Sequence, residues 1–70
     1  MNNIASERTR IGITQKDLAK KLGRSLTTVS RWEQGRGIPT ASELIGMHKL
    51  FGCSVDYLLG LSDERTYITR

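Results

Sequence analysis

Apolar residues recur at helical spacing on both sides of one glycine, Gly23, in the first half of the chain. The repeat predicts two short helices within residues 15–34, with inward faces made of Leu18, Ala19, Leu22, Val29 and Trp32. A turn this short needs a residue at positive φ, which glycine adopts without the steric clash of a Cβ. The small side chain of Ala19 also lets the two helices cross closely. The pattern therefore predicts a helix-turn-helix, whose second helix typically enters the major groove of DNA.

Residues with capping chemistry mark where the helices begin. Capping boxes, in which paired side chains satisfy free backbone N–H groups, are predicted for Thr14 with Asp17 and for Thr40 with Glu43, and simple N-caps for Ser25 and Ser54. The predicted fold is all-α, with five helices near residues 3–11, 15–22, 25–34, 40–51 and 54–59. They form one domain, residues 1–60, followed by a tail, residues 61–70. We expect this tail to be frayed; a short strand at residues 66–69 in a dimer is the alternative.

The fourth helix carries most of the predicted core of the second half. Its buried side is predicted to comprise Leu44, Ile45, Met47, His48 and Phe51. His48 is interpreted as a partly buried, hydrogen-bonded core residue and not as a metal ligand. Gly46, inside the same helix, indicates close packing or a local weakness, because glycine costs up to about 1 kcal/mol relative to alanine there. Cys53 is interpreted as a small buried hydrophobe.

The length and the cysteine count exclude several classes of protein. Seventy residues make one small domain, and a single cysteine forms no internal disulfide. With only one histidine there is no zinc set of the usual Cys/His kind. The sequence shows no membrane-spanning run, signal peptide, phosphate-cradling glycine loop or catalytic Ser/His/Asp or Cys/His set. We therefore expect a cytoplasmic protein that is not an enzyme, with no cofactor, membrane partner or small-molecule ligand.

Positive charge is concentrated in the half of the chain that holds the predicted helix-turn-helix. The formal net charge is +4, made of +5 in residues 1–36 and −1 in residues 37–70. Such a split is expected when one end of a domain faces phosphates and the other faces a protein partner or solvent.

The outward face of the second predicted helix, residues 25–34, carries polar and aliphatic side chains at spacings of three and four. A solvated face with no ligand is the alternative interpretation. Arg31 offers a fork that matches the two acceptors of guanine, and Leu26 and Thr27 can contact a thymine methyl. The predicted base contacts are Leu26, Thr27, Ser30 and Arg31.

Polar residues at helix ends and in the following loop are suited to hold the DNA backbone. They are predicted to contact phosphates and comprise Gln15, Ser25, Gln34 and Arg36. For Gln15, the alternative is a neutral residue of the first helical turn.

The arrangement of Gln15, Leu18, Ala19, Gly23, Val29 and Trp32 resembles the Cro/C1-type (XRE family) helix-turn-helix of phage repressors and small bacterial regulators. The stretches TQKDLA, RWEQG, IPTASEL and FGCSVDYLLG extend the resemblance over residues 4 to 60. It implies a compact five-helix, lambda-repressor-like domain. It also implies that Arg8 pairs with Glu33; a solvated surface charge is the alternative for Arg8. His48 departs from the small residue usual in the family.

The residues and the resemblance together predict a transcription regulator that binds double-stranded DNA in a sequence-specific way. We expect a repressor that binds an inverted-repeat operator as a homodimer, weak without DNA, with helix 25–34 in the major groove. The predicted dimer interface comprises Val55, Tyr57, Leu58 and Leu61. The alternative function is an antitoxin-like protein-binding module with secondary DNA binding.

Overall fold

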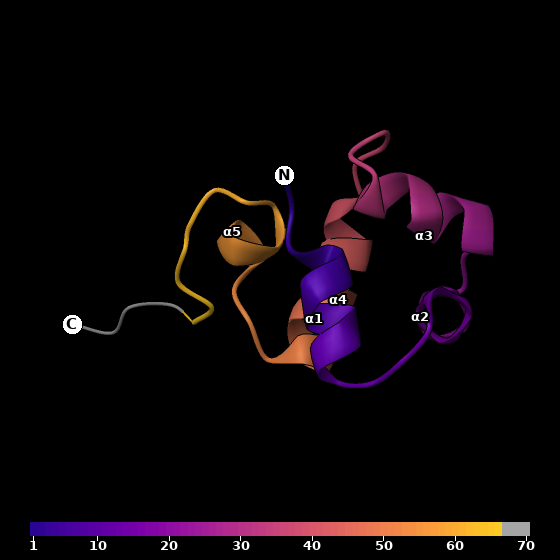
Figure 1. Ribbon diagram of the computed structural model, residues 1–70, viewed down its shortest axis with the longest axis horizontal. Helices are drawn as coiled ribbons and strands as arrows, with labels where there is room; N and C mark the ends of the chain where they lie inside the picture. The colour runs from indigo at the N-terminus through magenta and orange to yellow at the C-terminus, as the bar shows by residue number, and fades with distance from the viewer. Residues whose placement is uncertain (67–70) are drawn as a thin grey trace.

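The computed structural model describes residues 1–66 of the chain, and this part consists of helices joined by short loops (Figure 1). The helices are α1 (Ile4–Arg10), α2 (Gln15–Leu22), α3 (Leu26–Glu33), α4 (Ala41–Phe51) and α5 (Val55–Leu58). The predicted all-α fold with five helices is confirmed for the described residues, which include no strand. The strand considered for residues 66–69 falls almost entirely outside them.

The predicted caps form as local chemistry requires. In the first capping box, the Thr14 hydroxyl accepts from the Asp17 backbone N–H at 3.0 Å, and the Asp17 carboxylate accepts from the Thr14 N–H at 2.9 Å. Thr40 and Glu43 repeat this arrangement at the start of α4. Gly23, with φ of 67°, ends α2 in the left-handed conformation that favours glycine. These caps fix where α2 and α4 begin and where the turn into α3 occurs.

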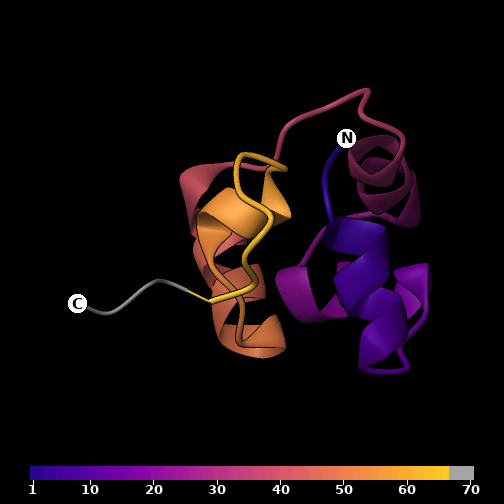
Figure 2. The ribbon, with the colours of Figure 1, turned by 60° about the vertical axis from the view of Figure 1, so that its left-hand side comes forward.

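The core lies between two groups of helices. Figure 2 shows α4 and α5 on one side and α1, α2 and α3 on the other. The side chains with no exposed surface come from all five helices and comprise Ile4, Leu18, Val29, Met47 and Leu58. Full burial of each such side chain stabilises the fold by about 1.5–3 kcal/mol relative to exposure. The core therefore ties the helix-turn-helix to the rest of the domain.

The outer face of α4 differs from the prediction at one position. Ile45 is 51% exposed, whereas Leu44, Met47 and Phe51 are buried. The reason is angular: those three follow one stripe of the helix, and Ile45 lies about 100° away from Leu44 around it. The prediction that Ile45 is buried was wrong.

Other predictions for the second half are confirmed. A Cβ built at Gly46 would lie 3.0 Å from Leu22 Cδ2, so α2 and α4 pack closely there. His48 is half-buried, and its Nδ1 lies 2.6 Å from the Cys53 carbonyl oxygen. The Cys53 side chain is 1% exposed, and burial raises the pKa of its thiol to about 11.

No helix in the described part of the chain has the length and apolarity that a bilayer span requires.

The segment after α5 is held against the domain as far as Arg65, so the expected frayed tail was wrong for this part. The Arg65 guanidinium donates to both carboxylate oxygens of Glu7, at 2.6 and 2.9 Å, and to the Phe51 carbonyl at 3.0 Å. Glu7 is 1% exposed and also accepts from Arg10 Nε at 3.2 Å. A carboxylate this buried requires cationic partners, and Arg65 supplies the closer one.

Candidate nucleic-acid interface

The predicted recognition face is the outward side of α3, which is held in place by the buried side of the same helix. Val29 and Trp32 are 0% and 3% exposed and fix α3 in the core. On the outer side, Leu26 is 49% exposed, and Thr27 and Arg31 are exposed as well. All three of these predicted base-contacting residues of α3 are therefore accessible.

Ser30 and Arg31 already have partners within this surface. The Ser30 hydroxyl accepts from Gln34 Nε2 at 3.1 Å, and Ser30 is half-buried. Arg31 Nη2 donates to the Arg36 carbonyl at 3.1 Å. The side chain of Arg31 is thus turned toward the loop after α3, and Arg31 as a whole remains exposed.

The residues predicted to hold phosphates lie around both ends of α3. Ser25 is its N-cap, and its hydroxyl accepts from the Thr28 backbone N–H at 3.1 Å. Gln34 is its C-cap, and Arg36 is exposed in the following loop. Gln15, at the start of α2, is half-buried. Gln15 Nε2 donates to Glu33 Oε1 at 3.0 Å, so its amide is oriented by α3.

Glu33 joins three elements through its carboxylate. Arg8 Nε donates to Glu33 Oε2 at 2.7 Å and Arg8 Nη2 to Oε1 at 3.1 Å, so the pair implied by the family resemblance is present and bidentate. The side chains are 18% and 7% exposed. The bonds to Glu33 raise the pKa of the Arg8 guanidinium above its ordinary value. Together with Gln15, this pair fixes α1, α2 and α3 relative to one another.

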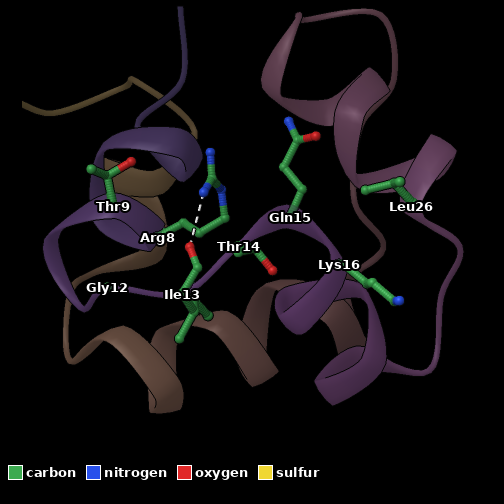
Figure 3. Close-up of a pocket in the computed structure, with 8 residues that line it drawn as sticks. All are labelled: Arg8, Thr9, Gly12, Ile13, Thr14, Gln15, Lys16 and Leu26. Carbon is green, nitrogen blue, oxygen red and sulfur yellow. Dashed lines mark hydrogen bonds between the residues drawn. The ribbon is translucent and has the colours of Figure 1, made fainter.

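A hollow lies beside Arg8, between the loop that joins α1 to α2 and the first turn of α3 (Figure 3). Arg8 Nη1 donates to the Ile13 carbonyl at 2.9 Å along its wall. Arg8, Gln15 and Lys16 present nitrogen atoms around it, and Leu26 borders it from α3. Lys16 is exposed, and sequence reasoning did not select it. Its chemistry suits an anion that approaches next to the recognition face.

Sequence reasoning also missed an ion pair behind the turn. Arg24 Nε lies 3.0 Å from Glu43 Oε2, and the Glu43 side chain is 10% exposed. The same carboxylate closes the capping box of α4, so it links the turn before α3 to the start of α4. The capping spacing identified Glu43, but nothing local in the sequence indicated its second partner.

The predicted dimer residues fall into two groups. Leu58 has no exposed surface and belongs to the core, so its assignment to an interface was wrong: α5 turns this residue inward against the other helices. Val55 and Tyr57 are half-buried, and Leu61 is 76% exposed. Leu61 lines a surface cleft together with Ile38, which is 82% exposed. Ile38 precedes α4 and was not among the predicted residues.

Comparison with known proteins places this geometry in a family. The helix-turn-helix family model matches residues 4–58. The chain is 35% identical over 57 residues to the cryptic phage CTXphi transcriptional repressor RstR of Vibrio cholerae, covering 81% of this chain and 51% of RstR. It is 40% identical over 52 residues to the HTH-type transcriptional activator BcrR of Enterococcus faecalis, covering 74% of this chain and 26% of BcrR. The chain thus spans about half or less of these relatives.

A solved structure has the same arrangement of helices. It is a crystal structure of the P22 c2 repressor protein in complex with a synthetic operator, with a TM-score of 0.75 and 34% sequence identity. The similarity covers 84% of this chain and 89% of that one. Because the family model spans well over half of the sequence and the fold agrees, this chain belongs to the helix-turn-helix family, in its Cro/C1-type (XRE) branch.

Proposed function

We propose that this chain is the DNA-binding domain of a transcription regulator, and that it acts as a repressor by placing α3 in the major groove of its operator. The observation that carries the proposal is the accessible outer face of α3 on a helix whose inner face is fully anchored. The similarity to a repressor solved with a synthetic operator supports it.

Within this proposal, two sets of side chains have different tasks. Leu26, Thr27, Ser30 and Arg31 contact base edges and set which sequence is preferred. A second set contacts phosphates and sets overall affinity: Gln15, Ser25, Gln34 and Arg36. The exposed Lys16 beside the hollow adds positive charge on the same side. Both sets lie in the half of the chain with net charge +5.

The regulator binds an inverted repeat as a homodimer that is weak without DNA. One recognition helix reads only a few base pairs, and a second copy places another helix one helical turn away, about 34 Å along the duplex. Leu61, flanked by Val55 and Tyr57, supplies the contact, and the exposed Ile38 in the same cleft extends it. The apolar surface available is small, which fits association that is completed on DNA.

Selection of bound sequences from random duplex DNA tests the proposal. A palindromic consensus is expected, with half-sites about 10 base pairs apart, and footprinting should show both half-sites protected together. A consensus with a single unpaired half-site would exclude the dimer and retain DNA reading. No enrichment, together with a protein that co-purifies with the chain, would instead favour an antitoxin-like binding module.

A further inference from the structure

Residues 1–3 run between the C-terminal ends of α3 and α5, as both ribbon views show (Figures 1 and 2). On the α3 side, Asn2 Nδ2 donates to the Trp32 carbonyl at 2.7 Å. The other end of the same amide, Oδ1, accepts from the Ile4 backbone N–H at 3.2 Å. One side chain thus links the last turn of α3 to the first residue of α1.

The next residue makes the equivalent link to α5. Asn3 Nδ2 donates to the Tyr57 carbonyl at 2.7 Å, and the Asn3 backbone N–H donates to the Leu58 carbonyl at 3.0 Å. Asn3 is the N-cap residue of α1, where asparagine usually accepts from its own helix, yet its side chain makes no such bond. The amide is committed to α5 instead.

The backbone of this segment lies directly on the turn that follows α5. Gly60 has φ of 79°, and a Cβ built there would collide with the Met1 carbonyl. Position 60 therefore favours glycine for two reasons: its positive φ angle, and the close approach of the Met1 backbone. The contact holds residues 1–3 close to the end of α5.

We propose that Asn2 and Asn3 form a strap that couples α3 to α5, so that the position of α5 sets the angle at which α3 meets DNA. This inference rests on the proposed function. The strap adds a second donor to the Trp32 and Tyr57 carbonyls, which also accept from the Gly35 and Gly60 backbone N–H groups. It also donates to the Leu58 carbonyl, one of the last carbonyls of α5, which have no partner within the helix. Asn2 and Asn3 are positioning residues, because they act on the recognition face through the helices that they hold.

Hydrogen exchange in the free protein tests the coupling without DNA. Asn2→Asp keeps the acceptor for Ile4 but puts a carboxylate oxygen against the Trp32 carbonyl, and Asn3→Asp does the same against Tyr57. Ser6→Asp, at an exposed position of α1, adds the same charge and is the matched control. The reporters are the amides that close the two helices, Gln34 on α3 and Leu59 on α5.

Each strap variant is expected to speed exchange of both reporters about tenfold relative to the control, because coupling between two sites is reciprocal. The strap is overturned if each variant affects only the helix that its own side chain touches. It is equally overturned if both variants behave like Ser6→Asp.

A DNA-binding measurement then tests the functional consequence. On the selected palindrome, Asn3→Asp, at a residue that does not line the cleft of Ile38 and Leu61, should bind a single half-site as Ser6→Asp does, while its gain in affinity from the second half-site falls about tenfold. An unchanged gain in affinity from the second half-site would overturn the effect of the strap on DNA binding and leave it a role in stability alone. If the wild-type chain selects no sequence at all, the proposed function fails, whereas the exchange experiment still decides whether the strap exists.

Discussion

Arg31 and Arg36 carry the same charge in two settings, and we expect this difference to separate sequence reading from general affinity. Arg31 projects from the outer face of α3, which is fixed by Val29 and Trp32 in the core. Arg36 is exposed in the loop after the helix, where no buried side chains of the same helix hold its backbone in place. A side chain on a fixed helix can discriminate between bases, while one on a loop mainly meets the phosphate charge.

Arg31→Ala should therefore cost about 1–3 kcal/mol on the preferred site and relax discrimination at one base pair. Arg36→Ala should weaken binding to all sequences alike and reduce the slope of affinity against salt by about one unit. The measurement is binding of each variant to the preferred site, its single-base variants and unrelated DNA across a salt series. Equal loss on every sequence for Arg31→Ala would make Arg31 a phosphate contact.

Glu7 gives the protein a predictable response to acid. Hydrogen bonds from Arg65, opposed by burial and assisted by Arg10, lower the pKa of this carboxyl below its usual 4.5. The folded state therefore binds this proton less readily than the unfolded state. The resulting stability is present above the unfolded pKa and is lost as the pH falls through the lowered folded pKa.

Thermal melts between pH 3 and 7 test this response. Removing the closer cation with Arg65→Ala should lower the melting temperature at neutral pH and move the acid transition to higher pH. Lys49→Ala, which removes an exposed cation from α4, is the matched control and should leave the transition where it is. An unmoved transition in Arg65→Ala would show that Arg10 alone suffices.

Among the elements, α1 and α3 are joined by an ion pair that is largely removed from water. Glu33→Ala should cost on the order of 3 kcal/mol, because it leaves the Arg8 guanidinium desolvated without its carboxylate. Denaturant melts followed by Trp32 fluorescence measure the loss, with Glu64→Ala at an exposed acid as the control. In a double-mutant cycle, adding Arg8→Ala should cost little more; full additivity would contradict a coupled pair.

The sequence predicted what is encoded locally and missed what depends on distant segments. Caps and helix ends were predicted because each involves residues within a few positions, as in the box of Thr14 and Asp17. Helical periodicity alone left the inner face ambiguous by one residue, which misplaced Ile45 and Leu58. The partnership of Glu7 with Arg65 spans 58 positions, and no spacing rule reaches that far. The exposed outer side of α3 was predicted because it is the complement of a strongly marked buried stripe on this helix.

At the scale of the whole molecule, the proposed reading of DNA and the proposed self-association use different surfaces. The predicted DNA-contacting side is made by α2, α3 and their loops, and the cleft lined by Ile38 and Leu61 lies beside α5. This division allows each activity to be altered alone.

Leu61→Asp should accordingly reduce affinity for the full palindrome at least about tenfold while leaving half-site binding unchanged. The reason is that an unpaired charge buried in an apolar contact between two copies destabilises the dimer. Ile45→Asp introduces the same charge at an exposed apolar residue of α4 that does not line the cleft, and it is the matched control. Comparable losses in the two variants would remove the cleft from the dimer.

The rate at which the buried Cys53 thiol is chemically labelled can report how often the core of the domain opens. With 1% of the residue exposed and the thiol pKa raised to about 11, the folded state presents almost no thiolate to an alkylating reagent. Modification must then wait for a fluctuation that exposes this residue, so the labelling rate measures how often the core opens under native conditions. Operator DNA that binds the closed form should slow that rate in proportion to its occupancy, which turns a spectator side chain into a quantitative assay for ligand binding.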